Sequence, residues 1–195
     1  YRHTGQQDLV VGTPIAGRSR TETENLLGYF TNTLVLRTGV TGEMTFGEVR
    51  RQVRRAALGA FEHQDLPYEK LVAEMNPKRT LSYNPVFQVL FGFGQLPPPP
   101  FTLSDLASTP FLIERELAKF DLTVSTSEVE TGLVGALEFR KDLFAPETIT
   151  RMMDHLENLI RGALANPHIP IADLPLLGDS ERKQLLIEWN DTRVD

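Results

Sequence analysis

A nine-residue run in the middle of the chain, residues 85–93, constrains the fold more than any other stretch. The run is nearly continuous in β-branched and aromatic residues, which is the pattern of a strand that is covered on both faces. Such a strand needs a paired neighbour on each side. We therefore expect residues 85–93 to lie at the centre of a β-sheet.

Shorter apolar runs predict the neighbouring strands. Residues 9–11 and 33–36 are rich in Val and Leu, and each run is closed by glycine or proline within a few residues. Residues 120–124 and 133–139 alternate between apolar and polar positions around a short turn, which predicts a long hairpin. The four consecutive prolines at 97–100 leave too few amide donors for a sheet and predict a surface loop.

Helix signals alternate with these strands. From Thr45 onward apolar residues recur at three- and four-residue spacing, and Thr45 and Glu48 have the spacing of a capping box. A proline in the first turn and an Asn-Pro pair after the last turn predict helices over 67–75 and 146–165. A short helix is expected over 180–189.

The composition is that of a globular chain. Of its 195 residues, 41% are hydrophobic and 24% are charged, with a formal net charge of -6. No apolar run is long enough to span a bilayer, and the acidic balance argues against nucleic acid as a partner. The absence of cysteine excludes thiolate nucleophiles and disulfides and fits a reducing cytoplasm. Because the chain begins at Tyr1 without a leader pattern, we expect a piece of a longer cytoplasmic protein.

The segment 63–72 contains a local arrangement of an acid and a base. His63 and Asp65 stand two residues apart, and an imidazole beside a carboxylate suits general-base catalysis. A structural interpretation explains the same residues, since His63 falls near a helix end and Asp65 is placed to cap the helix that Pro67 opens. We favour the structural interpretation because no nucleophile or second base stands nearby in the sequence.

Other charged and glycine-rich patterns are weaker. Arg50, Arg51, Arg54 and Arg55 repeat at four-residue spacing, so they lie along one side of the first predicted helix. They are candidates to receive an acidic partner or a phosphate-bearing arm, and a solvated face is the plainer alternative. The glycine-rich segment 12–19 lacks the lysine of a phosphate-binding loop, and the four histidines lack the spacing of a metal site. We therefore predict no metal and no directly bound cofactor.

Five segments in a fixed order carry the strongest functional signal. They are residues 10–18, 28–33, 63–72, 84–89 and 119–123. In this order and spacing they resemble the C-terminal half of a condensation domain of nonribosomal peptide synthetases, over essentially the whole chain. On this resemblance residues 1–170 form the C-terminal subdomain, and residues 171–195 form the linker toward a following adenylation domain.

The resemblance implies a chloramphenicol-acetyltransferase-like half-domain. Its fold is an α/β (α+β) two-layer sandwich in which a mixed sheet is backed by helices. Two such halves enclose a tunnel, where the amine of an acceptor attacks the thioester of a donor to form a peptide bond. Peptidyl carrier proteins deliver both substrates on phosphopantetheine arms. The implied partners are the N-terminal half of the domain, the carrier proteins and the downstream adenylation domain.

The resemblance also implies roles for individual residues. Condensation domains use an HHxxxDG motif, and this chain has no adjacent histidine pair, so we expect no catalytic residue here and no activity from the fragment alone. The expected residues are Asn32, Asn84, Gly92 and Gly94 along the tunnel, His63, Asp65, Pro67 and Asp121 as structural motif residues, and Arg50, Arg51, Arg54 and Arg55 for carrier docking.

The sequence is compatible with three interpretations. The first is the condensation-domain half, which supplies one wall of the tunnel and part of the carrier-docking surface. The second is a catalytically degenerate condensation-like module that only binds carrier proteins. The third, a free acyltransferase that uses His63 and Asp65, has the weakest support. For both asparagines, a local role in fixing a turn is favoured over contact with substrate.

Overall fold

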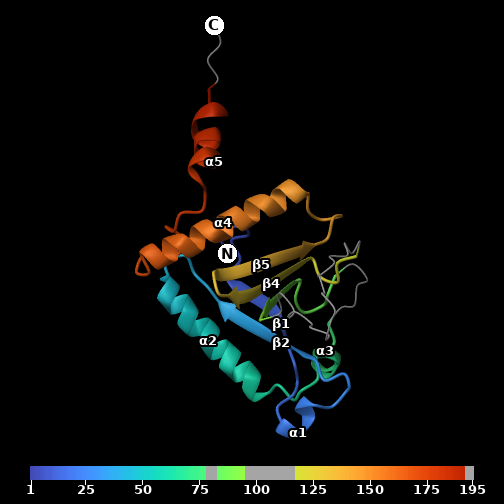
Figure 1. Ribbon diagram of the computed structural model, residues 1–195. Helices are drawn as coiled ribbons and strands as arrows, with labels where there is room; N and C mark the ends of the chain where they lie inside the picture. The colour runs from blue at the N-terminus through green and yellow to red at the C-terminus, as the bar shows by residue number, and fades with distance from the viewer. Residues whose placement is uncertain (78–82, 95–116, 192–195) are drawn as a thin grey trace, which may run out of the picture. The chain divides into compact units, whose positions relative to one another are not determined.

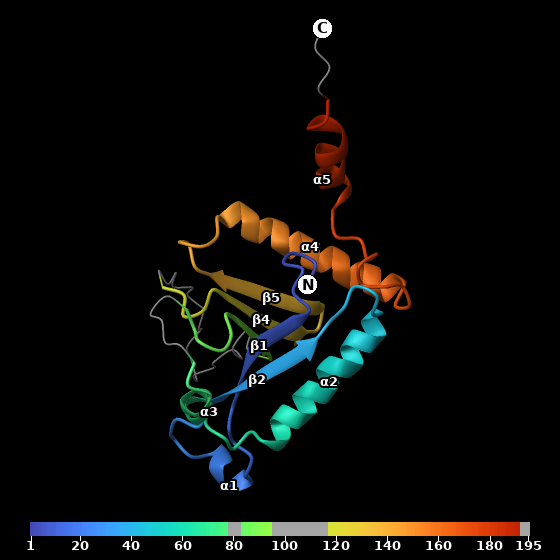
Figure 2. The ribbon, with the colours of Figure 1, turned by 180° about the vertical axis from the view of Figure 1, so that it is seen from behind.

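A computed structural model describes residues 1–77, 83–94 and 117–191 (Figure 1, Figure 2). These residues form one sheet in the order β2-β1-β3-β4-β5. The strands are β1 (Asp8–Ile15), β2 (Asn32–Gly39), β3 (Val89–Phe93), β4 (Leu122–Val129) and β5 (Gly132–Phe139). β3 runs parallel to β1 and β4, whereas β4 and β5 form an antiparallel hairpin. The mixed sheet and the predicted hairpin are thereby confirmed.

The helices other than the first, which was not predicted, begin and end close to the predicted positions. They are α1 (Thr21–Glu24), α2 (Phe46–Glu62), α3 (Tyr68–Met75), α4 (Pro146–Ala165) and α5 (Asp179–Lys183), which continues into the π-helical turn η1 (Gln184–Glu188). The capping box is present, since the N–H of Thr45 donates to the Glu48 carboxylate at 2.8 Å and the N–H of Glu48 donates to the Thr45 hydroxyl at 3.3 Å. α3 ends at Met75 and is followed by Asn76, whose φ of 41° is left-handed. These local signals fix the helix ends.

β3 occupies the central place predicted for the run at 85–93, but only its residues 89–93 form the strand. The prediction that both of its faces are covered is wrong for the described part of the chain. Phe91 and Phe93 expose 40% and 62% of their surfaces, whereas Gly92 between them is buried. Successive strand residues point to opposite faces, so β3 is buried on one face and open on the other.

The chain divides into two compact units, and one of them comprises Val10–Arg37 and Leu58–Leu143. Its most deeply buried side chain is Phe87, whose ring centroid lies 5.2 Å from that of Phe120 and 5.6 Å from that of Tyr68. Gly12 on β1 faces the same ring so closely that a Cβ atom there would lie 2.3 Å from the Phe87 side chain. Glycine at position 12 therefore leaves the space that Phe87 fills.

The other unit comprises Tyr1–Leu9, Thr38–Ala57 and Phe144–Asp195. Its buried apolar side chains are Val40, Ile149, Ala163 and Leu174. Gly162 of α4 lies against Pro175, since a Cβ atom at Gly162 would be 2.6 Å from the proline ring. The N–H of Ile171 donates to the Met44 carbonyl at 2.8 Å. Residues just after position 170 are thus bonded into this unit, and the predicted linker from 171 onward stays a prediction.

Two further predictions concern the proline loop and the absence of a membrane span. The proline loop at 97–100 lies outside the described residues. In the part of the chain that the structure describes, no helix combines the length and the hydropathy needed to cross a bilayer.

Candidate functional site

The segment that follows α2 holds the His63 imidazole against the end of that helix. Its Nδ1 lies 2.9 Å from the carbonyl oxygen of Gly59, and because a carbonyl only accepts, Nδ1 carries the proton and donates. The side chain is therefore bonded to the last turn of α2. None of the polar contacts described for His63 involves Asp65.

Asn32, at the start of β2, forms hydrogen bonds with the segment between α2 and α3. Its Nδ2 group donates to the carbonyls of Gln64 at 2.9 Å and Leu66 at 2.8 Å. Its Oδ1 accepts the N–H of Thr33 at 2.9 Å and the N–H of Tyr68 at 3.0 Å. Two donors and two acceptor sites are the whole capacity of an asparagine amide. Asn32 therefore has a local role that uses its side chain completely.

The predicted cap of α3 by Asp65 is wrong. The residue before the helix is Pro67, which has extended φ and ψ angles and makes no side-chain cap bond. The first-turn N–H of Tyr68 is instead satisfied by Asn32. Sequence reasoning missed this bond because the two residues stand 36 positions apart, and local capping rules consider only neighbours.

Asn84 fixes the turn before β3. Its Oδ1 accepts the Tyr68 hydroxyl at 2.8 Å and the N–H groups of Val86 at 3.1 Å and Phe87 at 3.3 Å. Burial raises the pKa of the Tyr68 hydroxyl. This turn places Phe87 in the core and directs the chain into β3.

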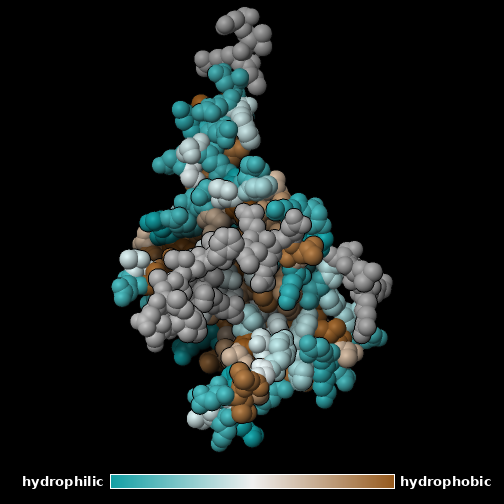
Figure 3. All heavy atoms as spheres, turned by 45° about the vertical axis from the view of Figure 1, so that its right-hand side comes forward, coloured by the Kyte–Doolittle hydropathy of each residue, from teal (hydrophilic) through white to brown (hydrophobic). Residues whose placement is uncertain are grey.

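The open face of β3 continues onto its partner strands. Phe91 pairs with Val124 and then Leu137, and Phe93 pairs with Thr126 and then Gly135. Apolar side chains are also exposed elsewhere on the surface, as Figure 3 shows in brown for one face. Paired residues across a sheet share a face, so these two rows make one continuous surface.

The two glycines predicted along the tunnel differ in their surroundings. Gly92 is buried, and its carbonyl accepts the Thr126 hydroxyl at 3.3 Å. Gly94 is exposed with a φ of 78°, a left-handed value that favours glycine, and its N–H donates to the Thr126 carbonyl at 2.7 Å. Both glycines are therefore held to β4 at the end of β3.

Asp121 belongs to a small cluster of charges just before β4. Arg140 lies 3.5 Å from its carboxylate and 2.5 Å from that of Asp142. The hydrogen bond to Asp142 raises the pKa of the Arg140 guanidinium, and the same bond lowers the pKa of Asp142. A pocket adjoins the cluster and is lined by Tyr83, Gln88, Asp121, Arg140 and Leu143. Asp121 is thus paired with Arg140 at the start of the hairpin, and its predicted structural role stays a prediction.

The four arginines of α2, Arg50, Arg51, Arg54 and Arg55, are exposed. None of them takes part in an ion pair with a carboxylate among the described residues. Their charges are therefore presented to solvent along one stretch of helix.

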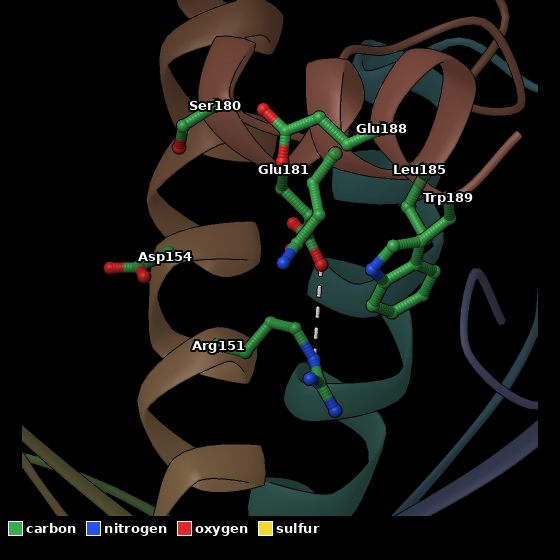
Figure 4. Close-up of a pocket in the computed structure, with 8 residues that line it drawn as sticks. Arg151, Asp154, Ser180, Glu181, Leu185, Glu188 and Trp189 are labelled. Atoms are coloured by element: carbon green, nitrogen blue, oxygen red, sulfur yellow. Dashed lines mark ion pairs between the residues drawn. The ribbon is translucent and has the colours of Figure 1, made fainter. Parts of the chain in front are cut away.

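A second pocket was not predicted from the sequence. It is lined by residues of α4 and of α5–η1, among them Arg151, Glu181 and Trp189, as Figure 4 shows. Beside it, Nε2 of His155 lies 2.7 Å from Oε2 of Glu181. The two residues are 26 positions apart, so sequence periodicity gives no sign of this pair. The described residues contain no group of three His, Asp or Glu side chains that could hold a metal ion.

Comparison with known proteins places this geometry in a family. Residues 1–186 match the Condensation domain family. A linear gramicidin synthase of Brevibacillus parabrevis is 50% identical over 196 residues, which cover 100% of this chain and 2% of that protein. The chain thus spans a very small part of this relative's length.

Two solved structures share the fold. The teicoplanin X-domain, solved in complex with OxyB, gives a TM-score of 0.80 at 26% identity, with 91% of this chain and 40% of that chain covered. The first condensation domain of the calcium-dependent antibiotic synthetase gives a TM-score of 0.68 at 20% identity, with 91% of this chain and 38% of that chain covered. The chain belongs to the condensation-domain family of nonribosomal peptide synthetases.

Proposed function

We propose that this chain is the C-terminal half of a condensation domain that forms peptide bonds between carrier-bound aminoacyl or peptidyl thioesters. One observation carries the proposal: a chain that matches the family over residues 1–186 covers only 38% of a solved condensation domain. We infer that the remaining part of such a domain comes from other residues of a longer protein. We assign that protein to the cytoplasm and place an adenylation domain after this half.

Exposed apolar side chains support a second half that covers them. Leu27 and Tyr29, between α1 and β2, expose 104% and 88% of their surfaces, and Phe93 exposes 62%. Leu27 and Tyr29 stand two residues apart, and large apolar groups that are exposed together commonly mark an interface. We assign these residues to the contact with the N-terminal half.

The proposed reaction is an acyl transfer. The acceptor amine attacks the donor thioester carbonyl, the C–N bond forms, and the C–S bond breaks. The phosphopantetheine thiol then leaves and takes up the proton that the amine loses. Because this chain has no adjacent histidine pair, we assign proton transfer to the other half. The contribution of this half is then to position the two substrates, which alone can lower the barrier substantially.

The wall of the tunnel is assigned to β3 and the turn before it. Phe91 and Phe93 supply an apolar surface, and Gly94 leaves backbone accessible beside them. Asn32 and Asn84 have a supporting role in this proposal, because their side-chain oxygens already accept hydrogen bonds within the protein. They would hold the wall in place without touching the substrate.

Carrier docking is assigned to Arg50, Arg51, Arg54 and Arg55. Four exposed guanidinium groups on one helix suit an acidic carrier surface or the phosphate of a phosphopantetheine arm. The arm reaches the tunnel as part of the substrate, so this half needs no cofactor of its own.

A second candidate function is a condensation-like module that binds partner proteins and catalyses nothing. The likeness to the teicoplanin X-domain favours it, since that domain was solved in complex with another protein, OxyB. In this case the arginines of α2 would still bind carriers, and the open face of β3 would line no reaction path.

One experiment separates these candidates. The 195-residue chain and a version extended at its N-terminus to a complete domain are each mixed with two loaded carrier proteins, and peptide-bond formation is measured. Product from the extended protein alone supports the condensation half and excludes the binding module. Carrier binding without product from either protein supports the binding module. Product from the short chain would contradict both, because it has no HHxxxDG motif.

A further inference from the structure

The buried imidazole of His155 on α4 forms a hydrogen bond with a residue of α5. Its side chain is 7% exposed, and Nε2 lies 2.7 Å from Oε2 of Glu181. Since a carboxylate only accepts, Nε2 donates to Glu181. The other ring nitrogen, Nδ1, is buried and has no hydrogen-bond partner among the described residues. The polar contact found for this buried ring in the described structure is thus the one with α5.

Glu181 is held by a second group from the same side. Nε of Arg151 lies 3.8 Å from Oε1 of Glu181, and Figure 4 shows the two side chains facing each other. Arg151 and His155 are four residues apart on α4, so they lie on one face of that helix. Both oxygens of the Glu181 carboxylate therefore have a partner on α4. We name this arrangement of Arg151, His155 and Glu181 the Glu181 lock.

The rest of α5–η1 is weakly anchored. Neither element contains a buried residue, and Leu186, Ile187 and Trp189 expose 60%, 61% and 66% of their surfaces. A helical segment of this length is not stable by itself in water. Its position therefore depends on the few contacts that it makes, of which the Glu181 lock is the most buried.

The segment just before α5 is anchored independently of the lock. Leu174 is 4% exposed, and the Leu176 carbonyl accepts a hydrogen bond from Asn158 of α4 at 3.1 Å. Gly178 then precedes the helix, and a Cβ atom there would meet nothing closer than 3.9 Å. The chain thus has room to turn between Leu176 and Glu181.

We propose that α5–η1 is a latched arm, which the Glu181 lock holds on α4 and which swings about Gly178 when the lock opens. The closed lock fixes where Trp189 lies, beside the pocket that it lines with Arg151. Opening releases Trp189 and its apolar neighbours together while residues up to Leu176 stay in place. This inference stands whichever of the two candidate functions holds, because it concerns the arm alone.

Distances between spin labels test the proposal on the full chain. The chain contains no cysteine, so Leu164→Cys on α4 and Ile187→Cys on η1 give two defined labels at exposed positions. In the parent chain we expect one narrow distance distribution. Glu181→Ala and His155→Phe should each reduce the narrow population to less than half. Glu181→Gln keeps an acceptor for His155 but loses the charge that faces Arg151. Its narrow population should lie between that of the parent and those of Glu181→Ala and His155→Phe.

Glu188→Ala is the matched control. Glu188 is an exposed carboxylate on the same arm and pairs with Lys183 at 3.8 Å, so its loss removes an equal charge without touching the lock. We expect the distribution of this variant to match that of the parent. A narrow distribution in Glu181→Ala, or equal broadening in Glu188→Ala, would overturn the proposal.

Limited proteolysis distinguishes a latch from a general loss of stability. Trypsin cleavage after Arg182 and Lys183 should become at least tenfold faster in Glu181→Ala, while cleavage after Arg140, in the other unit, keeps its parent rate. The thermal midpoint should also stay within a degree or two of the parent. If cleavage at all three sites accelerated together and the midpoint fell, Glu181 would be a general stability residue and the latch would be refuted.

Discussion

The Oδ1 atom of Asn32 accepts the backbone N–H of Tyr68 at 3.0 Å, although 36 residues separate the two. This bond satisfies a donor in the first turn of α3, which lacks a side-chain cap of its own. The amide group of the same side chain holds the carbonyls of Gln64 and Leu66. One asparagine thus connects the start of β2 to the segment that enters α3.

Asn32→Ala should destabilise the protein by about 2 kcal/mol, because several partly buried hydrogen bonds, each with a net contribution of about 1 kcal/mol, are lost together and not fully additively. Asn32→Asp keeps the acceptor for Tyr68 but turns a carboxylate oxygen towards the carbonyls of Gln64 and Leu66, which only accept, so its effect should be at least as large. Urea unfolding measures the free energy of unfolding of each variant. Thr31→Ala, at the exposed neighbouring position, is the control and should stay within about 0.5 kcal/mol of the parent.

Short-range sequence patterns predict most helices and strands of this fold. They do not predict the contacts of the candidate site. Thr45 and Glu48 predict the start of α2 because both partners of the capping box lie within one turn of the chain. The bond from Asn32 to Tyr68 depends on how β2 and α3 are brought together, which no local pattern encodes. Local rules therefore favour Asp65 as the cap, although it is merely nearby in the sequence. The exposure of Phe93 escapes prediction for a related reason, since an apolar run does not reveal which neighbours cover it.

Gly12→Ala should destabilise the protein by about 2 kcal/mol, because the added methyl group would lie 2.3 Å from the buried Phe87 ring. The measurement is the free energy of unfolding in urea. Gly39→Ala, also on a strand, is the matched control, since nothing lies within 4 Å of its added Cβ atom.

The substitution Phe87→Leu tests whether the clash with the ring causes the destabilisation by Gly12→Ala. If the clash with the ring explains the loss, Gly12→Ala should cost less in a Phe87→Leu background than in the parent. Equal costs in the two backgrounds would show that the methyl group acts through something other than Phe87.

His3 should titrate below its ordinary value near 6.5, because burial lowers its pKa and the neighbouring His155 lowers it further. The two rings stack with their centroids 5.2 Å apart. NMR titration of the His3 ring protons measures the pKa. His155→Phe, which keeps an aromatic ring there but removes the imidazole that lowers the pKa of His3, should move that pKa part of the way back towards 6.5. A midpoint at or above 6.5 in the parent would contradict this assignment.

The same shift predicts how stability depends on pH. Because the folded-state pKa of His3 lies below the unfolded-state value, the unfolded chain binds more protons between the two values. The contribution of His3 is therefore fully present above about 6.5, the unfolded value, and is lost as the pH falls towards the folded-state pKa. His3→Gln should flatten this part of a plot of unfolding free energy against pH. An unchanged slope would mean that other groups cause the acid-side loss.

Charge reversal at the arginines of α2 tests the proposed carrier docking. Arg50→Glu combined with Arg54→Glu should raise the dissociation constant for a carrier protein about tenfold at low salt, because attraction to an acidic surface becomes repulsion. Added salt should narrow this difference, since it screens exposed charges. Titration calorimetry on the complete domain measures both effects. Lys141→Glu, an exposed reversal far along the chain, is the control. Equal weakening by Lys141→Glu would indicate attraction to the overall charge of the domain, and unchanged binding by the arginine variant would place the docking surface elsewhere.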